Sequence, residues 1–230
     1  MIEEFNIKDD NAFRKSFVKI EFYPDDQNDI DDEMKYNLHI DEESTPDWFM
    51  VIQERITEDL RDIIRRMIIK NQSLKIITGK CIILSNSQIE KLQNVNCFIM
   101  KSSNVGVMKG SSNVGIMWGS SKVGIMWGNS NVGEMWGSSK VGVMWENSNV
   151  GVMKGSSKVG IMWGSSKVGE MWENSNVGVM KGSSKVGVMW GSSKVGVMWG
   201  SSKVGVMWGS SKVGVIVTVV IKSIRQWLNR

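Results

Sequence analysis

Histidine and cysteine are scarce in this chain of 230 residues, which has one histidine and two cysteines. The single histidine, His39, lies in a predicted strand, and a lone histidine is more often structural than catalytic. Because no Ser-His-Asp or Cys-His set can be assembled, we expect no enzymatic activity and no catalytic residues. Cys81 and Cys97 are too few for a disulfide framework, so we expect both to be reduced and buried.

Long apolar runs are also missing. No stretch reaches the roughly 18–20 apolar residues that a membrane-spanning helix needs, so we predict no membrane span. The first ten residues, MIEEFNIKDD, are acidic and contain no apolar core run, so we predict no signal peptide. Metal-ligand spacing is missing too, and we expect no metal and no cofactor. These features favour a cytoplasmic or virion-associated protein.

The chain has instead one nine-residue phrase that repeats without insertion from Asn104 to Val215. The phrase is GSSKVGVMW with small changes, and its Val-Gly pair occurs 13 times, from Val105 to Val213. A period this strict indicates one structural unit stacked on copies of itself. The glycines, valines and serines disfavour a helix, whereas Val-Gly-Val-Met-Trp predicts a strand and Gly-Ser-Ser a turn. We therefore predict a mostly β fold, a β-solenoid of nonapeptide repeats.

The positions of the charged substitutions indicate how many repeats close one coil. Two repeats would make an 18-residue coil with two sheets, and three would make a 27-residue coil. Glu146 and Glu173 are 27 residues apart, as are Lys154 and Lys181. A 27-residue coil would stack like charges about 4.8 Å apart. The 18-residue coil instead sets Glu173 above Gly155, next to Lys154, and we predict this coil.

Charged substitutions also indicate which side of the strand faces outward. We number the unit GSSKVGVMW from position 1 to position 9. Glu134 and Glu170 occur at position 7, and Lys109, Lys154 and Lys181 occur at position 9. Unpaired charges are not tolerated in a dry core, so positions 7 and 9 face outward. Strict alternation then predicts that the glycine at position 6 and the methionine at position 8 point inward, and that the valine at position 5 points outward.

The outward position 9 makes tryptophan the candidate binding residue. The nine tryptophans at this position are Trp118, Trp127, Trp136, Trp145, Trp163, Trp172, Trp190, Trp199 and Trp208. One interpretation is that stacked aromatic side chains simply stabilise the ladder. The alternative, which we favour, is that the patch they form is larger than a monomer usually exposes and is a binding surface.

The flanking segments predict an N-terminal α+β region. Ser16–Phe22 and Lys35–Ile40 alternate apolar and polar residues, as strands of a hairpin do. Thr45-Pro46-Asp47 has the composition of a helix start, and an apolar stripe at spacings of three and four follows it. We expect this helix to cover the open first coil of the solenoid. The predicted divisions are residues 1–72 (N-terminal capping region with a helix at about 46–70), 73–103 (irregular first coils), 104–215 (regular solenoid) and 216–230 (C-terminal strand and cap).

Charge is divided unevenly along the chain. Residues 1–100 carry 13 Lys/Arg and 20 Asp/Glu, a net charge of −7, whereas residues 101–230 carry 15 and 4, a net charge of +11. Lysine occupies position 4 in eight of the 13 units, and the tryptophans lie on the same faces. This combination keeps nucleic acid open as a partner. Carbohydrate and ice surfaces are further alternatives for a regular aromatic lattice.

The tandem SSxVGxM phrase, over residues 101–215, resembles uncharacterised repeat proteins of gut bacteria and their phages. The period of nine is similar to that of nonapeptide β-solenoids, but the turns contain Gly, Ser, Asn and Lys instead of calcium-binding aspartates. The resemblance implies repetition and a mobile-element origin, and no functional residue. From the residues we expect a non-enzymatic solenoid that acts by self-association or by binding a protein partner.

Overall fold

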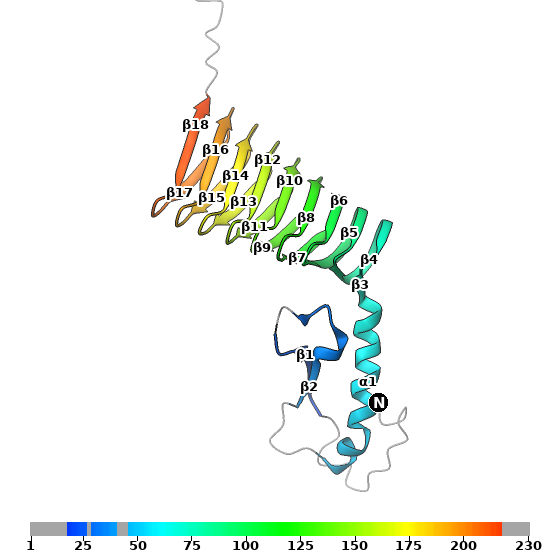
Figure 1. The fold of residues 1–230 in the computed structure, drawn as a ribbon. Coiled ribbons are helices and arrows are strands. Elements are labelled where there is room, and N and C mark those ends of the chain that lie inside the picture. The colour runs from blue at the N-terminus through cyan, green and yellow to red at the C-terminus, as the bar shows by residue number, and fades with distance from the viewer. Residues whose placement is uncertain (1–17, 27–28, 41–45, 218–230) are drawn as a thin grey trace, which may run out of the picture. The chain divides into compact units, whose positions relative to one another are not determined.

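The computed structural model describes residues 18–26, 29–40 and 46–217. These residues belong to two compact units, Met1–Ile69 and Lys70–Arg230. The first unit is a small α+β region and the second is a parallel β-solenoid, as predicted (Figure 1). The predicted cap within residues 218–230 lies outside the described residues.

The N-terminal unit contains the predicted hairpin and helix. Strands β1 (Ile20–Pro24) and β2 (Tyr36–Ile40) pair antiparallel, and a short 3-10 helix, η2 (Glu33–Lys35), precedes β2. Helix α1 (Asp47–Met67) buries Phe49, Ile52 and Ile56 from its apolar stripe. These three side chains pack with apolar residues of the hairpin, among them Ile20, Leu38 and Ile40. The hairpin therefore occupies the first half of the stripe, and coverage of the first coil by this helix stays a prediction.

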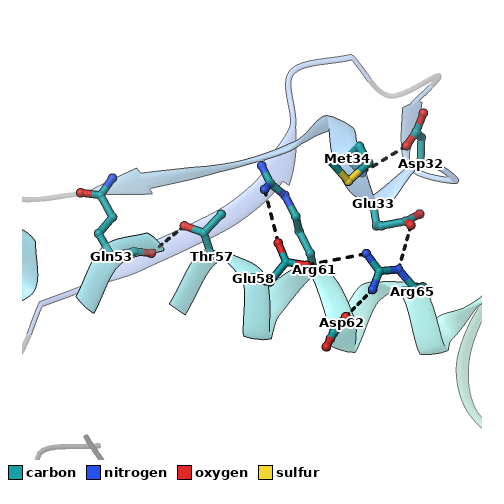
Figure 2. A network of polar contacts seen from close by, with 9 residues as sticks. All are labelled: Asp32, Glu33, Met34, Gln53, Thr57, Glu58, Arg61, Asp62 and Arg65. Atoms are coloured by element: carbon teal, nitrogen blue, oxygen red, sulfur yellow. Dashed lines mark hydrogen bonds and ion pairs between the residues drawn. The ribbon is translucent and has the colours of Figure 1, made fainter. Parts of the chain in front are cut away.

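The helix begins one residue later than predicted. Pro46 is the N-cap, with extended φ and ψ of −64° and 144°, and it makes no side-chain cap hydrogen bond. The proline therefore precedes the helix instead of occupying its first turn. Near the other end, Arg65 donates from Nε to Glu33 Oε1 at 2.9 Å and pairs with Asp62, so α1 and η2 are held together (Figure 2). The hydrogen bond to Glu33 raises the pKa of Arg65.

The solenoid begins with three irregular strands and continues with thirteen regular ones. The irregular strands are β3 (Ile68–Lys70), β4 (Ser73–Ser85) and β5 (Gln88–Met100). The regular strands are β6 (Asn104–Lys109), β7 (Asn113–Met117), β8 (Lys122–Met126), β9 (Asn131–Met135), β10 (Lys140–Met144), β11 (Asn149–Met153), β12 (Lys158–Met162), β13 (Lys167–Met171), β14 (Asn176–Met180), β15 (Lys185–Met189), β16 (Lys194–Trp199), β17 (Lys203–Met207) and β18 (Lys212–Val217). β4 and β5 pair in parallel with shifts in register around Gly79, so the first coils are less regular than the rest.

Each regular strand pairs in parallel with the strand two places along the chain, which confirms the 18-residue coil. Val141 in β10 is paired with Val123 and Val159, each 18 residues away. The strands consequently form two rows that meet at β5 (Figure 1). We call the row β6, β8, β10, β12, β14, β16 and β18 the even sheet, and the row β7, β9, β11, β13, β15 and β17 the odd sheet.

The interior differs from the prediction at two of the nine positions. Methionine at position 8 is buried as predicted, for example Met144 at 0% exposure. Valine at position 5 is also buried, as in Val141, although alternation predicted it outward. Glycine at position 6, predicted inward, lies on the outer side of the strand, as exposed Gly142 does. Strict alternation fails because positions 6 and 7 both face away from the interior before position 8 turns inward again.

Close packing of the backbone requires the glycine at position 6. A Cβ atom on Gly142 would lie 2.5 Å from the carbonyl oxygen of Gly124 in the neighbouring rung. The same approach, between 2.4 and 2.6 Å, recurs in all the other regular strands but β7, where a Cβ on Gly115 would meet the ring of Phe98 at 2.8 Å. Glycine is therefore needed for space and not for interior packing.

The turns between strands begin with position 1, where the chain has a positive φ. Gly137 has a φ of +66°, and Glu146 and Glu173 adopt +57° and +58° at equivalent sites. The N–H of position 3 donates back to the carbonyl of position 9, as Ser148 does to Trp145 at 3.2 Å. A positive φ at the second residue of such a turn is typical of type II′ and favours glycine. Each turn thus leads the chain from one sheet to the other.

Candidate interaction surface

Four positions of the repeat form columns on the outer face of each sheet. Position 4 is exposed or half-buried, position 6 is glycine, position 7 is half-buried except at the exposed Val206 and Val215, and position 9 is exposed or half-buried. Positions 7 and 9 share a face, because Trp136 donates from Nε1 to Glu134 Oε2 at 2.6 Å and Trp172 donates to Glu170 at 2.8 Å. The outward placement predicted for both positions is therefore confirmed.

All nine predicted tryptophans stand on these outer faces, in two columns. Trp127, Trp145, Trp163 and Trp199 follow strands of the even sheet, and Trp118, Trp136, Trp172, Trp190 and Trp208 follow strands of the odd sheet. Five of them are exposed, at 47% for Trp127, 40% for Trp145, 38% for Trp172, 43% for Trp199 and 55% for Trp208. The other four are half-buried.

The indole rings stack along each column. The centroids of Trp145 and Trp163 are 5.4 Å apart, with an angle of 5° between the ring planes. Trp118 and Trp136 stack at 5.4 Å, and so do Trp172 and Trp190. Eight of the nine tryptophans thus stack on a neighbouring ring, and Trp145 and Trp190 do so on both faces. The ring edges form an apolar ridge along each column, and few flat ring faces are left open for a ligand ring to stack on.

The lysines at position 9 continue the columns instead of interrupting them. Lys154 Nζ lies 4.2 Å from the ring centroid of Trp136, and Lys181 Nζ lies 4.6 Å from that of Trp163. Cation–π contacts of this kind compensate the loss of an aromatic neighbour. The predicted neighbour of Lys154 was Glu173, whereas the ion pair it makes is with Glu134, at 3.8 Å. The carboxylate at position 7 lies beside position 9, so Glu134 is nearer to Lys154 than Glu173 in the turn is.

The two outer faces differ at position 7. The odd sheet has a carboxylate there in two strands, Glu134 in β9 and Glu170 in β13. The even sheet has an uninterrupted aliphatic column at this position, namely Val107, Ile125, Val143, Ile161, Val179, Val197 and Val215. The outer face of the even sheet is therefore apolar from position 6 through position 9, apart from Lys109 and Lys181.

Position 4 adds a polar column to each face. On the odd sheet Asn149 donates to Asn131, and Asn131 to Asn113, both at 2.9 Å, so these asparagines form a hydrogen-bonded ladder. The same column continues with three stacked lysines, Lys167, Lys185 and Lys203. On the even sheet Lys122, Lys140 and Lys158 stack in the same way. The tryptophan pattern alone did not indicate these lysine columns. The sequence signal that indicates them is lysine at position 4 in units that lie 18 residues apart.

The remaining candidates make structural contacts. His39 stacks on Tyr23 in the N-terminal hairpin, with ring centroids 3.8 Å apart. Cys97 is buried in β5, where it pairs with Val114 and takes the place of the repeat valine. Within the part of the chain that the structure describes, no three His, Cys, Asp or Glu side chains gather as metal ligands would. None of the described helices has the length and apolar character needed to cross a membrane.

Comparison with family models, with curated proteins and with solved structures gives no match for this chain.

Proposed function

We propose that the solenoid is a non-enzymatic interaction module whose Trp-bearing faces bind a second copy of this chain or a protein partner. The supporting observation is the outer face of the even sheet, where an unbroken aliphatic column runs beside exposed tryptophan edges. Apolar surface in contact with water is costly, and a continuous strip of it is typical of an association surface. Regularity supports the same conclusion, since the strands of the even sheet pair in one constant register.

Nucleic acid is the second candidate, and the lysine columns favour it. Lysines stacked in register, such as Lys122 and Lys140, stand about 4.8 Å apart and repel each other unless an anion lies between them. A linear polyanion along the column would supply the compensating charge. Base stacking gains little support, because eight of the nine tryptophans already stack on a neighbouring tryptophan. The same stacking weighs against sugar rings, and the aromatic ridges are unlike the flat lattice that ice binding requires.

Salt dependence separates the two candidates. We expect sedimentation velocity of the full chain to detect an associated species that persists when the salt concentration is raised, because burial of apolar surface is not screened. Phosphate binding loses affinity steeply over the same range. Fluorescence anisotropy with a single-stranded oligonucleotide provides the second measurement. A chain that stays monomeric at all salt concentrations and binds the oligonucleotide at low salt would favour the second candidate.

A further inference from the structure

Each strand of the even sheet carries one lysine at positions 4 and 9, and never two. In β6 and β14 the lysine is at position 9, and position 4 is asparagine. In the other strands position 4 is lysine and position 9 is apolar. From β6 to β18 the pairs are Asn104 and Lys109, Lys122 and Trp127, Lys140 and Trp145, Lys158 and Trp163, Asn176 and Lys181, Lys194 and Trp199, and Lys212 and Val217. The choice at one end of a strand is thus linked to the choice at the other end.

Repulsion within one molecule does not explain this link. Positions 4 and 9 are separated by five residues of extended chain, about 16 Å, which exceeds the Debye length of about 8 Å at physiological salt. The two even-sheet units with lysine at position 9 also differ in sequence, KSSNVGVMK at 101–109 and ENSNVGVMK at 173–181. The odd sheet does not keep the link, since Asn113 and Asn131 lie in units that end in tryptophan. The link is complete on the even sheet alone, which points to the outer face of that sheet as its origin.

A second copy of the chain on that face brings the two positions together. If two even sheets face each other across a two-fold axis parallel to the solenoid, position 4 of each strand lies opposite position 9 of the same strand in the partner. In this arrangement each lysine at position 4 lies opposite Trp or Val at position 9 of the partner. Each asparagine at position 4 lies opposite a lysine at position 9 of the partner. The glycine column at position 6 likewise meets the aliphatic column at position 7. With the two-fold axis parallel to the strands, in contrast, the lysine column would face itself.

We infer that the even sheet joins two copies of this chain in parallel, with position 4 of one copy against position 9 of the other. This inference rests on the proposed function and names its partner. Lysine over tryptophan is a contact that the chain already makes, as Lys181 does over Trp163 at 4.6 Å. Strands of about 20 Å on seven rungs 4.8 Å apart give roughly 650 Å² per copy, about 1,300 Å² in total, which is within the range of specific interfaces.

The first test replaces tryptophans on one face at a time in the full chain. Trp127→Lys, Trp145→Lys and Trp163→Lys together place lysine opposite the partner's lysines, so we expect the dissociation constant from sedimentation to rise about tenfold or more. The matched control has Trp118→Lys, Trp136→Lys and Trp172→Lys on the odd sheet, and we expect it to dimerise like the wild type. Far-UV circular dichroism verifies that both variants keep the β-solenoid.

The second test restores the natural pairing. Adding Lys122→Asn, Lys140→Asn and Lys158→Asn to the even-sheet variant recreates the asparagine–lysine pairs of β6 and β14, and we expect the dimer to return. Adding Lys167→Asn, Lys185→Asn and Lys203→Asn on the odd sheet removes the same charge, and we expect no rescue. Equal rescue by both sets, or loss of the dimer in the odd-sheet control alone, would overturn the inference and leave the proposed function standing. A wild type that is monomeric at all concentrations and binds no protein would overturn both.

Discussion

Gly142 lies so close to Gly124 that a Cβ atom on the former would stand 2.5 Å from the carbonyl oxygen of the latter. Real Cβ atoms do not come this near to backbone oxygen, so any larger residue must push the two rungs apart. The same contact recurs along both sheets. The tight rung spacing therefore depends on an outward-facing glycine in every regular strand except β7.

This contact predicts the effect of adding one methyl group. Gly142→Ala should lower the free energy of unfolding by about 1–3 kcal/mol, as overpacking usually does. Ser138→Ala, at an exposed turn position, is the matched control and should change it by less than about 0.5 kcal/mol. Urea unfolding followed by circular dichroism measures both. Equal stability of the two variants would mean that the rungs are not held at this distance.

The sequence could predict the coil from its charge spacing and part of the interior from strand alternation. The spacing of Glu146 and Glu173 sufficed for the 18-residue coil because stacking of like charges depends only on the period. The predicted interior was wrong at positions 5 and 6, because a pattern of period two cannot anticipate two successive outward residues. The invariance of the position 6 glycine was the available signal, because glycine within a strand often marks close approach of another backbone. The stacked tryptophans followed from the period once position 9 was placed outside.

The inner and outer columns predict opposite responses to charge. Met162→Asp places a carboxylate among fully buried side chains and should cost several kcal/mol or prevent folding, because nothing there can pair with it. Trp163→Lys should be much milder, since the chain already has lysine at this position in Lys154 and Lys181. Thermal unfolding of the two variants provides the comparison. A harmless Met162→Asp would show that position 8 is not interior.

The serine at position 3 offers a matched pair of buried hydroxyls. Ser103 Oγ donates to the carbonyl of Met100 at 2.9 Å, whereas Ser157 Oγ is buried and makes no hydrogen bond within the described residues. Ser103→Ala should therefore cost about 1 kcal/mol, and Ser157→Ala should be close to neutral or slightly stabilising. Urea titration at one temperature tests this difference. A larger loss for Ser157→Ala would indicate a hydrogen bond to bound water.

Stacked coils should tolerate deletion in steps of 18 residues. Removing Gly182–Trp199 takes one strand from each sheet and leaves every later unit on its own sheet, so a shorter folded protein should result. Removing Gly182–Trp190 alone moves every later unit to the opposite sheet, including the last one, which departs from the repeat at Ile216 and Val217. We expect the first deletion to keep a cooperative melting transition and the second to lower Tm more. Equal Tm values would argue that the two sheets are interchangeable.

The two parts of the candidate site, its tryptophans and the difference between its faces, depend on different signals in the sequence. The nine tryptophans could be placed on the surface from their lysine substitutions alone. The difference between the two faces depends on the 18-residue register, because that register assigns each unit to a sheet. Only then do Glu134 and Glu170 fall on one sheet, and the aliphatic column on the other.

Spin-label distances test the parallel dimer most directly. The background carries Cys81→Ser and Cys97→Val, and single cysteines replace Ser102 or Ser192, exposed turn residues 90 positions apart, or five rungs, on the same edge. In a parallel dimer the label-to-label distance within a same-site dimer (102 with 102, or 192 with 192) should be shorter than in a mixed dimer (102 with 192). The five rungs add about 24 Å along the axis of the mixed pair. A mixed-pair distance shorter than both same-site distances would mean an antiparallel dimer and would contradict the proposed interface.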